Sequence, residues 1–95
     1  MGTAWRFEVY FLQDSRYGGR STVQALRELL RQRLGEGYEL EEIDVAASPE
    51  RAEANRVLAI PTLIRRWPLP ECRYLGAIHG VKLDCLLEVP TQELQ

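Results

Sequence analysis

Residues 57–64, which read VLAIPTLI, constrain the fold of this chain more than any other segment. They join a stretch with helical character to a short run of β-branched residues, and Pro61 stands at the junction. Proline cannot donate a hydrogen bond to a sheet, so it is tolerated at the first residue of a strand but not in its middle. Because Ile60-Pro61-Thr62 must convert a helix into a strand within two residues, we predict a cis peptide bond before Pro61.

A helix, a proline of this kind and a strand resemble the cis-proline corner of thioredoxin-like domains. A redox enzyme of that type needs a thiolate in the loop before its first helix, where the helix N-terminus lowers the pKa of the thiol. Residues 13–20 form that loop here and contain no cysteine, and the chain's only two cysteines, Cys72 and Cys85, do not form a C-x-x-C pair. The sequence therefore favours a binding module over an enzyme, with a redox protein using Cys72 as the alternative.

Length and composition favour a single domain over residues 1–95 with one modest core. No apolar run approaches the roughly 20 residues of a membrane span, and the first residues lack the apolar core of a signal peptide. A net charge of -2 gives no sign of a nucleic-acid or membrane partner. Two cysteines and the single histidine, His79, cannot form a closed zinc site. We therefore expect a cytoplasmic domain with free thiols and no cofactor or metal.

Hydrophobic periodicity predicts the element order βαβαββα, an α/β fold of thioredoxin-like type with a central mixed sheet. The first β-α-β unit implies that its two strands pair in parallel. Ser21 is expected to cap the first helix, with Gln24 completing a capping box. The expected strands span residues 7–11, 38–45, 62–64 and 73–75, and the expected helices span 21–34, 48–58 and 81–89.

Several motifs together resemble the KaiB family of circadian clock proteins. They are, in order, Ile43-Asp44-Val45, Ser48-Pro49-Glu50, Ala52-Glu53, residues 56–63 with the sequence RVLAIPTL, Pro68-Leu69-Pro70, Arg73 and Leu75-Gly76. Their order and spacing match the family pattern over about three quarters of the chain, from about Trp5 to Gly76. Several motifs that agree in order form a fairly specific signal.

The resemblance implies a thioredoxin-like domain that binds protein. KaiB proteins bind the KaiC ATPase ring and recruit KaiA and histidine kinases, so a KaiC-like ATPase, a KaiA-like protein or a histidine kinase is the implied partner. A homo-oligomer, dimer or tetramer, is also implied. Arg56 matches a basic residue that faces KaiC in the family, and Arg65 and Arg73 are expected to extend the same basic face. A stress-response adaptor with this fold and no clock role is a further alternative, and ordinary solvation is the simpler account of the arginines.

KaiB proteins are known for switching the fold of their C-terminal half. Leu87 and Val89 fall where the family has a glycine and an aspartate associated with that switch. Leucine favours a helix over glycine by about 1 kcal/mol. The sequence therefore predicts one dominant, thioredoxin-like state.

Overall fold

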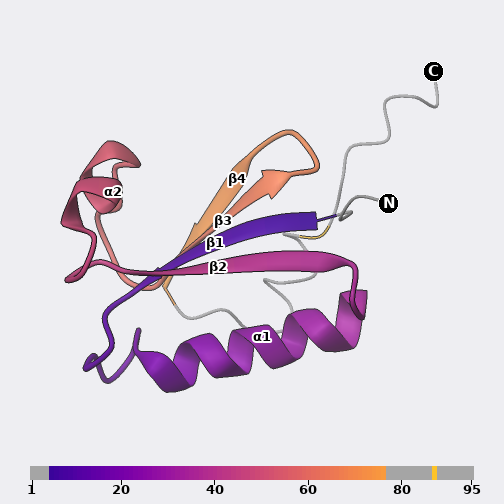
Figure 1. Ribbon diagram of the computed structural model, residues 1–95, viewed down its shortest axis with the longest axis horizontal. Coiled ribbons are helices and arrows are strands. Elements are labelled where there is room, and N and C mark those ends of the chain that lie inside the picture. Colours follow the sequence, from indigo (N-terminus) through magenta and orange to yellow (C-terminus); the bar gives the residue numbers. More distant parts are fainter. Residues whose placement is uncertain (1–4, 77–86, 88–95) are drawn as a thin grey trace.

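The computed structural model describes residues 5–76 and Leu87, and contains six elements of secondary structure (Figure 1). In chain order these are β1 (Trp5–Phe11), α1 (Arg20–Leu34), β2 (Tyr38–Asp44), α2 (Pro49–Ala54), β3 (Thr62–Trp67) and β4 (Cys72–Leu75). The strands form one mixed sheet in the order β2-β1-β3-β4. Strand β1 pairs in parallel with β2 and antiparallel with β3, which forms an antiparallel hairpin with β4. The predicted order is confirmed through β4. Apart from Leu87, the helix expected over 81–89 lies outside the described residues, as do His79 and Cys85.

The alternation of β1 divides the core between the two faces of the sheet. Phe7, Val9 and Phe11 point to the face that α1 covers, and Leu87 packs against this cluster. Tyr10 points to the opposite face, where Ala52 of α2 packs against its cluster. The buried members of the α1-face core are Phe7, Val9, Phe11, Val23, Leu26, Leu30 and Leu63, and those of the α2-face core are Tyr10, Ile43 and Ile64. A strand with apolar residues on both faces belongs in the middle of a sheet, and β1 lies between β2 and β3.

The predicted N-cap of α1, Ser21, was wrong by two residues. The helix begins at Arg20, its N-cap is Gly19, and no side chain caps it, so the Ser21–Gln24 capping box does not form. The loop before α1 determines where the helix begins. Gly19 passes so close to the loop that a Cβ there would lie 2.3 Å from the carbonyl oxygen of Ser15. The chain therefore turns into the helix at a residue where only glycine fits.

The boundaries of α2 and β3 also differ from the prediction. Helix α2 begins at Pro49 after Ser48, as expected, but ends at Ala54 instead of continuing to about residue 58. Strand β3 extends beyond residue 64 to Trp67 because its two arginines find partners. Arg65 donates to the carbonyl oxygen of Pro70, and Arg66 forms ion pairs across the sheet. The peptide bond between Ile60 and Pro61 is cis, as predicted.

Candidate protein-binding surface

The C-terminal end of α2 is formed around an arginine in a conformation that usually belongs to glycine. The backbone N–H of Arg56 donates to the carbonyl of Glu53 at 3.0 Å, and the N–H of Val57 donates to the carbonyl of Ala52 at 2.9 Å. These two hydrogen bonds define a Schellman motif, which needs a left-handed residue at the position of Arg56. Arg56 supplies it with a φ of 54°. For a residue with a Cβ, the left-handed conformation costs about 1–2 kcal/mol.

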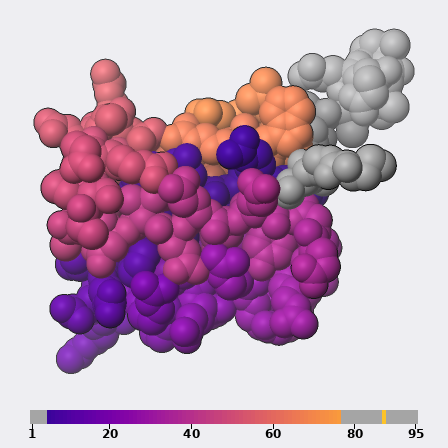
Figure 2. Space-filling view, viewed as in Figure 1, coloured from indigo at the N-terminus to yellow at the C-terminus, as the bar shows by residue number. Residues whose placement is uncertain are grey.

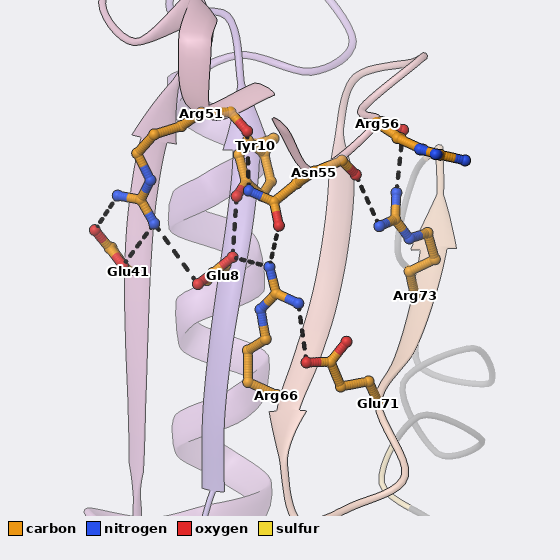
Figure 3. A network of polar contacts seen from close by, with 9 residues as sticks. All are labelled: Glu8, Tyr10, Glu41, Arg51, Asn55, Arg56, Arg66, Glu71 and Arg73. Carbon is orange, nitrogen blue, oxygen red and sulfur yellow. Dashed lines mark hydrogen bonds and ion pairs between the residues drawn. The ribbon is translucent and has the colours of Figure 1, made fainter. Parts of the chain in front are cut away.

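Arg73 of β4 lies against this end of the helix (Figure 3). Its Nη1 donates to the carbonyl oxygen of Arg56 at 3.2 Å, and its Nη2 donates to that of Asn55 at 2.9 Å. The last carbonyls of a helix have no partner within it and carry partial negative charge, so a guanidinium is well placed there. In the space-filling view the atoms of α2 adjoin those of the β3–β4 hairpin (Figure 2). Arg73 thus connects α2 to β4, and it also places its own charge beside that of Arg56.

Next to this pair lies a set of charged and polar residues centred on Glu8, which we call the Glu8 network (Figure 3). Oε1 of Glu8 accepts hydrogen bonds from Nη2 of Arg66 at 2.9 Å and from the Tyr10 hydroxyl at 3.0 Å. Arg66 also donates to Oδ1 of Asn55 at 2.5 Å and to Oε2 of Glu71 at 3.0 Å. The network therefore joins β1, β3 and the segment before β4 to the end of α2.

Arg51 extends the Glu8 network toward the edge strand β2. Its guanidinium contacts both carboxylate oxygens of Glu41, at 2.5 and 3.2 Å, and lies 3.6 Å from Oε2 of Glu8. The hydrogen bond from Arg51 lowers the pKa of Glu41. Burial, followed by the hydrogen bond to Glu8, raises the pKa of Tyr10. Both shifts favour the protonation states present at neutral pH, a carboxylate and a neutral phenol.

The arginines of this face fall into two groups. Arg51 and Arg66 each contact two carboxylates. Within residues 5–76, by contrast, the Arg73 side chain is bonded only to neutral carbonyls, and the exposed Arg56 side chain has no hydrogen bond or ion pair. We call Arg56 and Arg73 the arginine pair. It is the part of this face whose positive charge is not balanced locally by the described residues.

The third arginine expected on this surface does not share it. Arg65 is 2 % exposed and donates to the carbonyl oxygen of Pro70. Because side chains alternate along a strand, Arg65 belongs to the α1 face of the sheet, whereas Arg66 faces α2. The sequence therefore predicted correctly that Arg56 and Arg73 lie close together. It placed Arg65 on the same face, where Arg66 lies instead. The period-2 alternation of β3 carries the signal that separates these two arginines.

Pro61 lies where the loop before α1 meets the start of β3. The proline is buried, and Gly18 approaches it so closely that a Cβ on Gly18 would lie 2.8 Å from its nitrogen. The loop contains no cysteine and therefore no thiol. Cys72, the other candidate for redox chemistry, is half-buried on β4 and packs against the α1-face core. The described residues hold no cluster of side chains suited to a metal ion. None of their helices is long and apolar enough to cross a membrane.

This arrangement of strands and helices defines a class of protein, that of thioredoxin-like domains. The fold resembles thioredoxin from Fasciola hepatica, with a TM-score of 0.71 at 20% identity over 90% of this chain and 80% of that one. It also resembles the N-terminal domain of SasA from Synechococcus elongatus, with a TM-score of 0.62 at 14% identity over 90% of this chain and 79% of that one. At these identities the likeness concerns the fold.

Within that class, the sequence matches the model of the KaiB domain over residues 11–88. It is 36% identical to circadian clock protein KaiB3 of Synechocystis sp. over 65% of this chain and 62% of that protein. It is 32% identical to circadian clock oscillator protein KaiB of Prochlorococcus marinus over 76% of this chain and 65% of that protein. The matches thus span somewhat less than two thirds of the length of these relatives. The chain belongs to the KaiB family.

Proposed function

We propose that this chain is a non-catalytic signalling module that binds a KaiC-type ATPase ring through the arginine pair, in the manner of a clock protein. The names of its relatives, which are circadian clock proteins, support the clock role. A histidine kinase is a second partner, which the resemblance to the KaiB family implies. A KaiA-like protein is a third.

One observation carries the binding site. Arg56 occupies a left-handed position where glycine would cost less, and its exposed side chain makes no hydrogen bond or ion pair with the described residues. Strained backbone conformations cluster at functional sites, where the surrounding structure holds them in place. Beside it, Arg73 adds a second charge without a carboxylate among the described residues. Two guanidinium groups placed together suit an acidic patch on a protein partner.

The test is the affinity for a KaiC-type ATPase ring from the same genome, measured by biolayer interferometry. Arg56→Glu reverses one charge and places a carboxylate beside Arg73. The new carboxylate repels an acidic partner, and it also compensates the positive charge of Arg73. We expect Kd to rise roughly 30-fold, equivalent to about 2 kcal/mol. Raising the salt concentration should weaken binding by the wild-type chain, because salt screens exposed charges. An unchanged Kd for a folded Arg56→Glu variant would remove the arginine pair from the proposal.

Arg31→Glu is the matched control. Arg31 is exposed in the last turn of α1, at the opposite end of the molecule from α2 (Figure 1). The substitution makes the same change in net charge, so a general effect of charge would weaken binding equally in both variants. We expect the control to bind within about twofold of the wild type, because long-range effects of a single exposed charge are screened.

The non-catalytic part of the proposal has its own assay. Disulfide exchange needs an accessible thiolate, and Cys72 is half-buried against the core. Reduction of insulin with dithiothreitol as donor should therefore proceed at the rate of the blank without protein. Turnover that disappears in a Cys72→Ser variant would instead establish the redox alternative. The binding assay also distinguishes the third alternative, a KaiB-like adaptor in a stress response, because such an adaptor would not bind a KaiC-type ring.

A further inference from the structure

The side-chain amide of Asn55 joins the end of α2 to the sheet (Figure 3). Its Nδ2 donates to the carbonyl oxygen of Arg51 at 2.9 Å, and its Oδ1 accepts from Nη2 of Arg66 at 2.5 Å. A carbonyl oxygen can only accept a hydrogen bond and a guanidinium can only donate one, so the side chain between them must do both. An amide meets this requirement, whereas a carboxylate would serve Arg66 alone.

Arg66 is itself held by residues of the sheet. The same Nη2 donates to Oε1 of Glu8 at 2.9 Å, and Nη1 donates to Oε2 of Glu71 at 3.0 Å. The side chains of Arg66 and Glu8 are 26% and 17% exposed, so salt screens their contact less than it screens an exposed ion pair. Asn55 is therefore bonded to a guanidinium whose place is fixed by β1 and β3.

The end of α2 depends on such contacts because the helix is short. It has six residues and none of them is buried, and a helix of this length gains little stability from its own hydrogen bonds. Arg73 donates to the backbone carbonyls of Asn55 and Arg56. The left-handed Arg56 also follows Asn55 directly in the chain. The place of the Asn55 backbone thus determines where both guanidinium groups of the arginine pair lie.

We infer that Asn55, held by Arg66, is a positioning residue for the binding site and acts on the partner through the arginine pair. The inference rests on the proposed function in taking the arginine pair as the site that meets an acidic protein. Long side chains lose rotamer freedom when a partner binds them, and a site that is already ordered avoids part of this cost. Asn55 therefore raises the affinity by ordering two arginines before the partner binds.

Asn55→Leu tests the inference, because leucine is similar in size, makes neither hydrogen bond and changes no charge. Binding of the full chain to the KaiC-type ATPase ring is measured by biolayer interferometry, and we expect Kd to rise about tenfold. In a chain that also carries Arg56→Ala and Arg73→Ala, Asn55→Leu should change Kd by less than about twofold, since residues that act through one contact are not additive. An equal loss in both backgrounds would overturn the inference.

Tyr10→Phe is the matched control. It also exchanges one neutral side chain for another, and it removes the hydrogen bond from the Tyr10 hydroxyl to Glu8 while leaving both contacts of Asn55 in place. Its Kd should stay within about twofold of the wild type, because the arginine pair keeps its support. A loss as large as that of Asn55→Leu would mean that general loosening of the Glu8 network weakens binding, and it would overturn the inference.

Nuclear magnetic resonance tests the ordering in the full chain without a partner. In the wild type, backbone chemical shifts should report a positive φ at Arg56, and the Nε–H group of Arg73 should be ordered. In Asn55→Leu we expect its order parameter to fall below about 0.6, the range of flexible groups. Unchanged shifts and an unchanged order parameter would overturn the inference, whatever the ring binds.

The inference and the proposed function fail in different ways. If Arg56→Glu weakens binding and Asn55→Leu does not, the inference is wrong and the proposed function stands. If Arg56→Glu binds as the wild type does, the proposed function is wrong, and the inferred role of Asn55 in binding is wrong with it. Arg66→Lys is the second variant for both assays if Asn55→Leu does not fold. It keeps the charge but lacks the planar fork that reaches several acceptors, so it should change both measurements in the same direction.

Discussion

The two faces of the sheet are built by different means. On the α1 face, seven buried apolar residues from two strands and a helix form one continuous cluster. On the α2 face the buried apolar cluster of the described residues comprises Tyr10, Ile43 and Ile64, and α2 has no buried residue of its own. The Glu8 network and Arg73 take the place of apolar packing there, and they hold the end of α2 through Asn55 and Arg56.

The difference indicates where the chain gains stability and where it has freedom to bind. Burial of apolar surface stabilises without regard to direction, whereas partly exposed ion pairs contribute little net free energy. The α1 face should therefore dominate the free energy of unfolding. The α2 face presents charge to the surroundings, and it is also where the arginine pair lies. Four predictions test this division.

The largest effect is expected on the α1 face. Leu30 is fully buried between α1 and the sheet. Leu30→Ala removes apolar contacts and leaves a cavity, so we expect the free energy of unfolding to fall by about 2–5 kcal/mol. Urea denaturation followed by circular dichroism measures it. The same change at the exposed Leu58 should cost less than about 0.5 kcal/mol. Equal losses at the two leucines would contradict the division between the faces.

A smaller effect is expected at the centre of the Glu8 network. The Glu8 side chain is 17% exposed and accepts from Arg66 and Tyr10 while pairing with Arg51. Glu8→Ala leaves these three donors without their shared acceptor, and we expect a loss of about 1–3 kcal/mol, since bonds to a charged group are among the stronger ones. A loss as large as that of Leu30→Ala would show that the polar face stabilises the domain as strongly as the core.

The sequence predicted most of this fold because its strongest signals are local. Alternation in residues 7–11 and helical spacing of Val23, Leu26 and Leu30 depend only on neighbouring residues, and both were confirmed. The boundaries that were missed depend on contacts distant in sequence. The first helix begins at Arg20 because Gly19 is crowded by the loop before it.

The candidate site was predictable only in part, for the same reason. The family resemblance pointed to Arg56 and Arg73, which the hairpin brings together. The alternation of β3 separates the buried Arg65 from Arg66, but no local signal shows that Arg66 forms an ion pair with Glu8, a residue 58 positions away. The end of α2 was also hidden, because an arginine in a left-handed conformation is not a sequence signal for a helix C-terminus.

A third prediction separates strain from function at Arg56. Glycine adopts the left-handed conformation without steric cost, so Arg56→Gly should raise the free energy of unfolding by about 1 kcal/mol. The greater conformational entropy of glycine in the unfolded chain reduces this gain. The same variant lacks the guanidinium and should bind an acidic partner more weakly. Urea denaturation and the binding assay are performed on one preparation. A variant that is destabilised would show that the arginine side chain holds the end of α2, and tighter binding would show that it has no part in recognition.

The smallest effect concerns two adjacent glutamates that point to opposite faces of β2. Burial raises the pKa of Glu42, but hydrogen bonds from Arg27 and Arg20 on the α1 face outweigh it, and the net pKa is lowered. The hydrogen bond from Arg51 on the α2 face lowers the pKa of Glu41. A carboxyl group whose pKa is lower in the folded state stabilises the fold above its unfolded pKa of about 4.3, and that stabilisation disappears as the pH falls through the folded pKa.

Both neutral variants, Glu42→Gln and Glu41→Gln, should therefore differ most from the wild type at neutral pH and converge with it in acid. The Glu42 side chain is 26% exposed and has two arginine partners, whereas that of Glu41 is 54% exposed and has a closer contact to one. We expect a loss of about 1 kcal/mol for Glu42→Gln and less than about 0.5 kcal/mol for Glu41→Gln, since exposure weakens an ion pair. Urea denaturation between neutral pH and about pH 3 measures both, because that range brackets the unfolded pKa of glutamate. If Glu41→Gln proves the more costly, α2 is held to the sheet more firmly than its exposure indicates, and the α2 face is a structural support as well as a binding surface.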